Sequence, residues 1–201
     1  MISVLIDRAN LVTTIGLMCG VFSVIFTVNQ EWELSILLML LAVFCDVSDG
    51  IVARRFRKIK DELLSKIGVQ FDSLADLIHS GIAPGLFIYY YTGQTLISTA
   101  LLIIMVIACF LRLAYFNCVG LTDDGYFYGV PVFYSPMLLA VVLFLAITYS
   151  TNIILYFYAI IIPALQVSSA IRIKKFKGTG FYIFMVILIS EVLFYSYHVY
   201  F

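Results

Sequence analysis

The chain has 201 residues, of which 63% are hydrophobic and 12% are charged, and its mean hydropathy is +1.08. This composition excludes a water-soluble globular domain and indicates an integral membrane protein. The formal net charge at pH 7 is zero, and the basic residues are not arranged to wrap a polyanion, so nucleic acid is not an expected partner.

Apolar runs of about 20 residues, the length that crosses a bilayer as a helix, recur along the chain. They predict seven spans, which are Leu11–Val28, Leu34–Val52, Val69–Tyr91, Leu96–Cys118, Val130–Tyr149, Ile153–Ile173 and Phe181–Phe201. Because a backbone in lipid must satisfy its own polar groups, runs of this length form helices. We therefore expect an all-α, polytopic transmembrane helical bundle that forms a single integral membrane domain over residues 1–201.

The positive charges predict the orientation of these spans. When the loops are numbered in alternation, all twelve Lys and Arg residues fall on one side of the membrane. They are Arg8, a group between Arg54 and Lys66, Arg112, and a group between Arg172 and Lys177. Basic loops remain inside the cell, so we expect a multi-pass protein of the cell membrane with the basic ends in the cytoplasm and the C-terminus outside.

Two pairs of aspartates flank the connection between the second and third apolar runs. Asp46 and Asp49 are three residues apart, and Asp72 and Asp76 are four apart. At helical spacing each pair shares one face, with Cβ atoms about 5–6 Å apart. A charge in a spanning helix costs roughly 2.5–3.5 kcal/mol on insertion scales, so such residues are retained where they are paired, hydrated or bound to cations. The segment 46–76 is therefore the expected catalytic motif, at the cytoplasmic boundary.

The residue types in this segment favour a phosphate site built on metal ions. Carboxylate ligands favour Mg²⁺ or Mn²⁺, with Ca²⁺ as a third candidate, over zinc. Two such ions about 3.5–4 Å apart can clamp a phosphate and stabilise a displacement. Gly50 and Gly68 remove side chains where a substrate must come close, although helix packing or a cap explains both glycines equally well.

The same residues resemble the signature of the CDP-alcohol phosphotransferases. That family has a D-x-x-D-G-x-x-A-R run, followed by a glycine with aspartates four and eight residues later. The matching positions here are Asp46, Asp49, Gly50, Ala53, Arg54, Gly68, Asp72 and Asp76. The segment Arg55–Ile67 is longer than is usual in the family, and its polar, basic character predicts a lengthened cytoplasmic connection.

Further runs are similar to the phosphatidylserine synthase branch of that family. They are Asn10–Thr13, Phe71–Asp76, Gly81–Pro84, Leu111–Asn117 and Gly129–Pro131. The chain departs from the branch at Ala9, where Pro is usual, at Tyr115, where Arg is usual, and at His79-Ser80, where Ser-Phe is common. These departures bear on the contacts to the acceptor more than on the chemistry.

The resemblance implies a six-helix family core followed by a C-terminal span, and a homodimer. It also implies the reaction, in which the hydroxyl of L-serine attacks the β-phosphorus of CDP-diacylglycerol, or of CDP-archaeol, and CMP leaves. The product is phosphatidylserine or archaetidylserine. Membrane lipids surround the site and accommodate the lipid chains of the donor substrate.

The site residues follow from the same resemblance. Asp76 is the implied general base, and Asp46, Asp49 and Asp72 are mainly metal ligands, with Asp76 also able to contact a metal. The residues implied for the CDP-lipid are Asn10, Thr13, Gly50, Ala53, Arg54 and Gly68. Arg112 and Asn117 are the candidates for the serine carboxylate and its surroundings, because a guanidinium pairs with a carboxylate in a bidentate way.

Several alternatives remain open at this level. Arg112 could be an interface anchor, His79 could orient Asp76 or simply be packed, and Glu191 in the last span has no assigned role. Glycerol phosphate or inositol phosphate could replace serine as the acceptor, although a single Arg inside the spans favours serine. From a different class, a cation transporter would also carry membrane acids, but usually with broken helices at the midplane and repeat symmetry.

Overall fold

The computed structural model describes residues 7–56, 62–175 and 178–200. Its helices, in chain order, are α2 (Arg8–Val28), α3 (Trp32–Phe56), α4 (Glu62–Asp76), the π-helix η1 (Leu77–Ile82), α5 (Ala83–Tyr91), α6 (Leu96–Val119), α7 (Tyr134–Thr148), α8 (Ile153–Val167) and α9 (Thr179–Tyr200). Two short strands, β1 (Tyr126–Tyr128) and β2 (Arg172–Lys174), pair antiparallel. The predicted all-α bundle is confirmed, with this one strand pair added.

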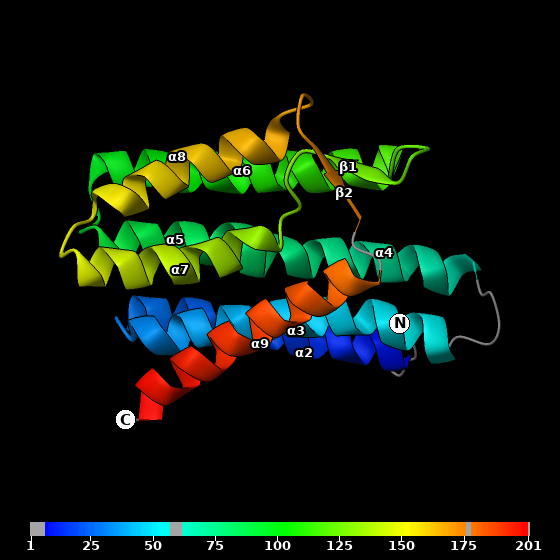
Figure 1. The fold of residues 1–201 in the computed structure, drawn as a ribbon, viewed down its shortest axis with the longest axis horizontal. Coiled ribbons are helices and arrows are strands. Elements are labelled where there is room, and N and C mark those ends of the chain that lie inside the picture. The colour runs from blue at the N-terminus through cyan, green and yellow to red at the C-terminus, as the bar shows by residue number, and fades with distance from the viewer. Residues whose placement is uncertain (1–6, 57–61, 176–177, 201) are drawn as a thin grey trace.

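The helices stack in three layers, as Figure 1 shows. One outer layer contains α6 and α8, the middle layer contains α7 and the continuous rod α4–η1–α5, and the other outer layer contains α2, α3 and α9. α9 crosses the bundle obliquely and contacts α3 and α7. The strand pair lies toward the same end of the bundle as α4, beside the last turns of α6, where Tyr128 and Phe127 contact Tyr115 and Phe116.

The outer surface of the bundle is apolar, which fits a lipid environment. α2, α3 over Trp32–Ala53, α6 and α9 are each long and apolar enough to cross a membrane, and α7 and α8 are shorter apolar helices. On α2 the exposed positions are large apolar residues, such as Leu11 and Phe22, and the buried positions are small or polar. This arrangement is the reverse of a water-soluble helix, and it supports the membrane assignment.

The structure corrects three of the predicted boundaries. The sixth predicted span was expected to extend to Ile173, but the corresponding helix α8 ends at Val167 because the backbone becomes extended at Ser168 before β2 begins. The fifth predicted span corresponds to α7, which begins at Tyr134 and not at Val130 because the preceding residues leave β1 through a turn. The helix of the third segment, α4, begins at Glu62 and not at Val69, so residues 62–67 of the connection are helical.

Large apolar side chains fill the bundle far from the aspartates. Ile36 of α3, Phe87 of α5, Leu143 of α7 and Leu155 of α8 are completely buried in one cluster, which also includes Leu188 of α9. Close apolar packing therefore holds these helices together at the end of the bundle where no catalytic residue was predicted.

A seam of small residues on α2 brings the first helix close to the predicted site. A Cβ atom added at Gly16 would lie 3.0 Å from Cβ of Cys45, and one added at Gly20 would lie 3.0 Å from Cβ of His79. Glycines at this spacing let helix backbones approach closely in membranes. The seam continues to Thr13 and Asn10, which are buried about one and two turns before Gly16 on the same face.

Candidate active site

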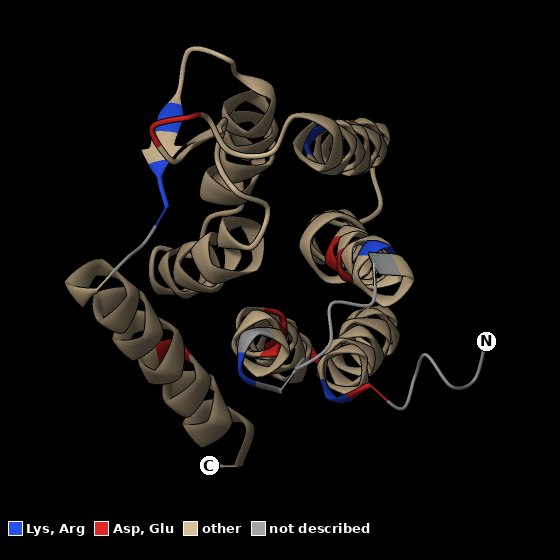
Figure 2. Ribbon diagram, turned by 90° about the vertical axis from the view of Figure 1, so that its right-hand side faces the viewer, with Lys and Arg blue, Asp and Glu red and all other residues tan. Residues whose placement is uncertain are grey.

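The four aspartates lie at one end of the bundle, on two neighbouring helices. Asp46 and Asp49 are on the last turns of α3, and Asp72 and Asp76 are on the last turns of α4. Figure 2 views the molecule from this end, and red segments of neighbouring helices face one another inside the bundle, while blue segments lie on the strand pair, at helix ends and within one helix. The fold thus brings together two pairs that are far apart along the chain.

The carboxylates are close enough to share cations. Asp46, Asp49 and Asp72 each offer one ligand atom, and these atoms all lie within 4.8 Å of one another. A second group with the same spacing consists of Asp46, Asp76 and His79. Asp46 belongs to both groups, so it lies between two potential cation positions. Carboxylates at such short range repel one another unless protons or cations intervene.

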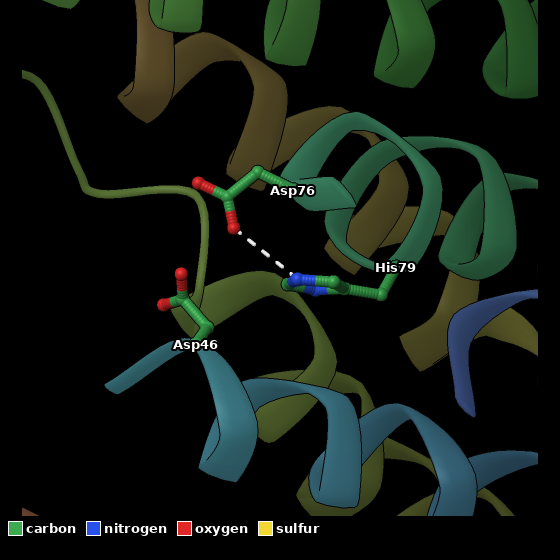
Figure 3. Close-up of side chains that lie close together, drawn as sticks. All are labelled: Asp46, Asp76 and His79. Atoms are coloured by element: carbon green, nitrogen blue, oxygen red, sulfur yellow. Dashed lines mark ion pairs between the residues drawn. The ribbon is translucent and has the colours of Figure 1, made fainter. Parts of the chain in front are cut away.

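His79 enters the site through the π-helix that follows Asp76. Pro84 has no N–H to donate to the carbonyl of residue 80, and its ring displaces that carbonyl. The chain responds with wider turns, and the N–H of Ala83 bonds to the carbonyl of Ile78. Such π segments are common at functional sites. Figure 3 shows the result, with the His79 ring beside Asp76 and facing Asp46.

The imidazole of His79 is fixed at both nitrogens. Its Nδ1 lies 2.9 Å from the hydroxyl of Ser80, and its Nε2 lies 3.2 Å from Oδ1 of Asp76. His79 is 1% exposed, so it is packed and hydrogen-bonded and also contacts the carboxylate. Both roles considered for it from the sequence are therefore compatible.

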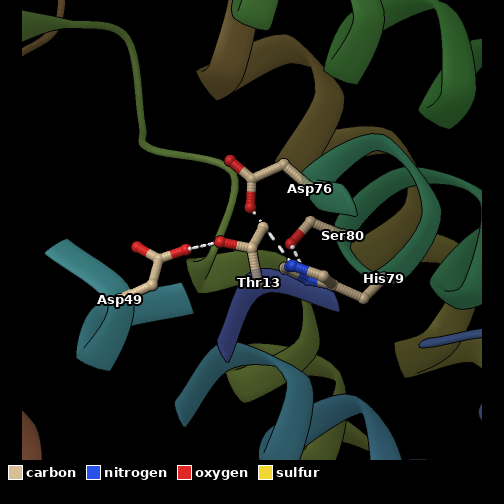
Figure 4. A network of polar contacts seen from close by, with 5 residues as sticks. All are labelled: Thr13, Asp49, Asp76, His79 and Ser80. Carbon is tan, nitrogen blue, oxygen red and sulfur yellow. Dashed lines mark hydrogen bonds and ion pairs between the residues drawn. The ribbon is translucent and has the colours of Figure 1, made fainter. Parts of the chain in front are cut away.

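Thr13 links α2 to this cluster, as Figure 4 shows. Its hydroxyl donates a hydrogen bond to Oδ2 of Asp49. By contrast, Oδ1 of Asp76 is buried and accepts no hydrogen bond among the described residues, although Nε2 of His79 is near it. A buried carboxylate oxygen without a hydrogen bond lowers the stability of the fold unless a cation or a proton binds to it. The oxygen-rich donor set therefore fits a hard divalent cation.

A cavity of about 160 Å³ opens beside Asp49 and Asp72. It is lined by Ala9, Asn10, Thr13, Asp49, Ala53, Ser65, Gly68, Val69 and Asp72. Four of the six residues predicted for the CDP-lipid thus line one cavity. Gly50 does not line it in the described part of the chain, and the side chain of Arg54 lies outside the described residues. The sequence prediction missed Ser65, which is one helical turn before Gly68 and for which spacing is the only signal.

Arg112 of α6 is buried within the bundle, with 5% of its surface exposed. Its guanidinium carbon lies 5.1 Å from the ring centre of Phe116 and 5.7 Å from that of Phe127. Its Nε has no hydrogen-bond partner among residues 7–56, 62–175 and 178–200. An interface anchor would extend its charge into water, so this burial argues against that alternative.

Arg112 also lines a second cavity, of about 540 Å³. The lining residues come from α6, β1 and the end of α8, and they are Leu111, Arg112, Ala114, Tyr115, Cys118, Tyr128, Gln166, Val167, Ser168 and Ser169. Asn117 does not line this cavity. Its Nδ2 donates to Oγ of Ser73 at 2.9 Å, and that hydroxyl donates back to its Oδ1 at 3.2 Å. Asn117 therefore ties α6 to α4 beside Asp72.

Comparison with known proteins gives a consistent result. The family model described as CDP-alcohol phosphatidyltransferase matches residues 7–161. The chain is 30% identical to a CDP-diacylglycerol–serine O-phosphatidyltransferase of Helicobacter pylori over 90% of this chain and 77% of that protein. It is 32% identical to an archaetidylserine synthase of Methanothermobacter thermautotrophicus over 61% of this chain and 52% of that protein. A phosphatidylcholine synthase of Borreliella burgdorferi is 27% identical over 67% of this chain and 57% of its own length.

Proposed function

The chain belongs to the CDP-alcohol phosphatidyltransferase family, and we propose that it transfers the phosphatidyl group of a CDP-activated lipid to the hydroxyl of L-serine. Members of this family act on a CDP-lipid and an alcohol within the membrane, so this chain is a membrane enzyme of that class. Family membership favours this assignment over a cation transporter. The donor is CDP-diacylglycerol or CDP-archaeol, since relatives named for both kinds of lipid are similar to the chain.

The cavity beside Asp49 and Asp72 is the proposed nucleotide site. Its lining is small or polar, with Asn10, Thr13 and Gly68 offering hydrogen bonds or backbone access. The lipid chains of the donor would lie in the bilayer against the apolar outer faces of the surrounding helices. Gly50 and Arg54 belong to the matched signature and are proposed to complete this site, with the guanidinium of Arg54 near the phosphates.

The four aspartates are the proposed ligands for two divalent cations, Mg²⁺ or Mn²⁺, with Ca²⁺ as the third candidate. The fit rests on the close carboxylates of Asp46, Asp49 and Asp72 and on the unsatisfied oxygen of Asp76. When bound, the cations neutralise the pyrophosphate and stabilise the charge that develops on the leaving CMP.

Asp76 is the proposed general base. As the bond between the serine oxygen and the β-phosphorus forms, the bond to the CMP oxygen breaks and the serine proton passes to Asp76. His79, 3.2 Å from Oδ1 of Asp76, limits the positions that this carboxylate can adopt. Asp76 is 8% exposed, so the proton is accepted in a site shielded from bulk water.

The main support for serine as the acceptor is the position of Arg112, a buried cation that lines a cavity of about 540 Å³. It can pair with the carboxylate of an amino acid in a bidentate way. Arg112 is the only charged residue in the described lining of that cavity, whereas an acceptor with a phosphate, such as glycerol phosphate or inositol phosphate, would need more positive charge. Choline is itself a cation and would be repelled. Asn117 is proposed to support this region from the α4 side.

We assign the aspartate end of the bundle to the cytoplasm, the C-terminus to the outside of the cell membrane, and the working form to a homodimer. The orientation is supported by the basic residues Arg8, Arg172 and Lys174, which belong to this end of the bundle. The dimer is proposed from the family resemblance. Cysteine labelling from each side of the membrane and the mass of the detergent-solubilised protein test these two points.

Transfer assays with purified protein in lipid nanodiscs test the main proposal. Radiolabelled serine, glycerol phosphate, inositol phosphate and choline are each offered with CDP-diacylglycerol and with CDP-archaeol, in the presence of Mg²⁺ or Mn²⁺. Serine-dependent release of CMP is the expected result. Preferential use of another acceptor would reject serine, and the absence of transfer from both donors would reject the proposed reaction.

A further inference from the structure

We propose that Phe127, together with Phe116, is a positioning residue that holds the guanidinium of Arg112 for the carboxylate of the acceptor. This inference rests on the proposed function, in which Arg112 binds serine. Phe127 lies on β1, a strand that the sequence analysis did not predict.

The two rings and the cation form one compact group. The guanidinium carbon of Arg112 lies 5.1 Å from the centre of Phe116 and 5.7 Å from the centre of Phe127, and the two ring centres are 5.5 Å apart. Both distances to the cation fall within the range of cation–π attraction. A guanidinium held by aromatic rings keeps N–H groups available for a carboxylate. An ion-pair partner at Arg112 would instead occupy those groups.

Phe127 lies close to Arg112 because several contacts hold β1 in position. Phe127 pairs with Ile173 in the strand ladder, and Tyr128 contacts Tyr115 of α6 at a ring distance of 6.1 Å. After the strand, the N–H of Gly129 donates to the carbonyl of Ile171 at 2.9 Å. The position of the Phe127 ring is therefore set by backbone bonds and not only by its own contacts.

Gly129 allows β1 to approach the end of α8. It has a φ of +70°, and a Cβ atom there would lie 2.1 Å from the carbonyl oxygen of Gln166. Such a separation is far below any contact distance, so only glycine fits without moving the strand. The strand is thus held against the same cavity that Arg112 lines, since Gln166 and Tyr128 also line it.

The arrangement explains how a long side chain can be fixed at low cost. An arginine has many rotamers, and binding that must first select one of them loses affinity. The rings preselect the position of the guanidinium, while the described part of the chain leaves its Nε without a hydrogen-bond partner. The binding of the carboxylate should therefore depend on the rings, whereas the binding of the CDP-lipid in the separate cavity beside Asp49 should not.

Phe127→Leu tests this, because leucine keeps an apolar side chain and removes the aromatic face. We expect the KM for serine to rise about three- to thirtyfold, with the KM for the CDP-lipid and the thermal unfolding temperature unchanged. Phe127→Tyr retains the ring and should restore the parent KM for serine. The matched control is Tyr126→Leu, which removes a ring from the same strand where no contact to a cation is seen in the described residues.

A double-mutant cycle with Arg112→Ala separates this inference from the proposed function. If Phe127 acts through Arg112, Phe127→Leu has no further effect on the serine KM once Arg112 is alanine. Multiplying effects in the double variant, an equal rise in both KM values, or the same result from Tyr126→Leu would overturn the role of Phe127 and leave serine binding by Arg112 standing. An unchanged serine KM in Arg112→Ala itself would overturn the role of Arg112, and with it that of Phe127.

Discussion

The two ends of this bundle are packed with different kinds of residue. At the apolar end, α3, α5 and α7 bury large side chains such as Ile36, Phe87 and Leu143. At the aspartate end, α2 and η1 bury small and polar residues beside the carboxylates, such as Ala9, Thr13 and His79. The same helix, α3, serves both ends, with apolar residues early and aspartates late in its length.

The comparison indicates that folding stability and catalysis depend on different parts of the same helices. Carboxylates brought close together repel one another and lower the stability of the fold that holds them. Tight apolar packing elsewhere in the same helices can hold their backbones in place. Changes at the apolar end should therefore affect folding, and changes at the aspartate end should affect turnover.

Asp72→Asn should produce the largest effect. It removes one ligand of the cluster that Asp46 and Asp49 complete, and it also relieves carboxylate repulsion. Activity that depends on divalent ions should fall by at least about a hundredfold, while the protein stays folded and inserted in the membrane. Asp123→Asn, at an exposed acid outside the cluster, is the control. Full activity of the variant, or activity of the parent in excess EDTA, would reject the metal cluster.

Asp76→Asn should lower turnover by about 10²–10⁴, because the amide cannot accept the proton of the acceptor hydroxyl. Binding of the CDP-lipid, measured by calorimetry, should survive. If binding is lost as severely as turnover, Asp76 is mainly a metal ligand and the base lies elsewhere. Normal turnover would reject the mechanism.

Phe87→Ala tests the apolar end. The Phe87 ring is fully buried, stacked on Tyr91 with ring centres 5.5 Å apart, and it contacts the edge of Trp32. Its loss should reduce the free energy of unfolding by roughly 2–4 kcal/mol, less than in a soluble core because lipid is also apolar. The kcat of the protein that remains folded should be unchanged, with Tyr182→Ala at an exposed ring as the comparison. A drop in kcat without a loss of stability would contradict the separation.

Thr13→Val keeps the shape of the side chain and removes the hydroxyl that donates to Asp49. We expect the divalent ion concentration needed for half-maximal activity to rise about tenfold, the scale of one hydrogen bond to a charged group. Thr14→Val is the matched control, because the hydroxyl of Thr14 bonds only to the backbone carbonyl of Asn10 among the contacts seen. Equal effects of both variants would place the cause in the helix and not in the site.

Glu191→Gln should have the smallest effect on activity. Glu191 lines a cavity of about 330 Å³ between α7 and α9, with one oxygen buried and without a hydrogen-bond partner in the described residues. Because the amide keeps the size of the side chain, the substitution should leave kcat unchanged and change the free energy of unfolding by about 1 kcal/mol or less. A large loss of activity would reveal that α9 takes part in the site.

Much of this molecule follows from local spacing in the sequence. Apolar runs of about 20 residues predict spanning helices because lipid leaves the backbone no other partner. Aspartates three and four residues apart share a helical face, so the closeness of Asp46 and Asp49 could be predicted, whereas Asp72 and Asp76 fall in different groups of close ligand atoms. Neither inference needs any knowledge of how the helices pack.

Contacts between segments that are distant in the sequence became visible only in the tertiary structure. His79 joins Asp46 because Pro84 forces a π-helix, and Phe127 meets Arg112 because β1 pairs with a strand some 45 residues later. Helix α8 ends earlier than predicted because the chain beyond Val167 leads into β2, the strand that pairs with β1. Contacts between distant segments depend on how whole helices pack against one another, and the spacing of residues within one segment carries no record of that packing.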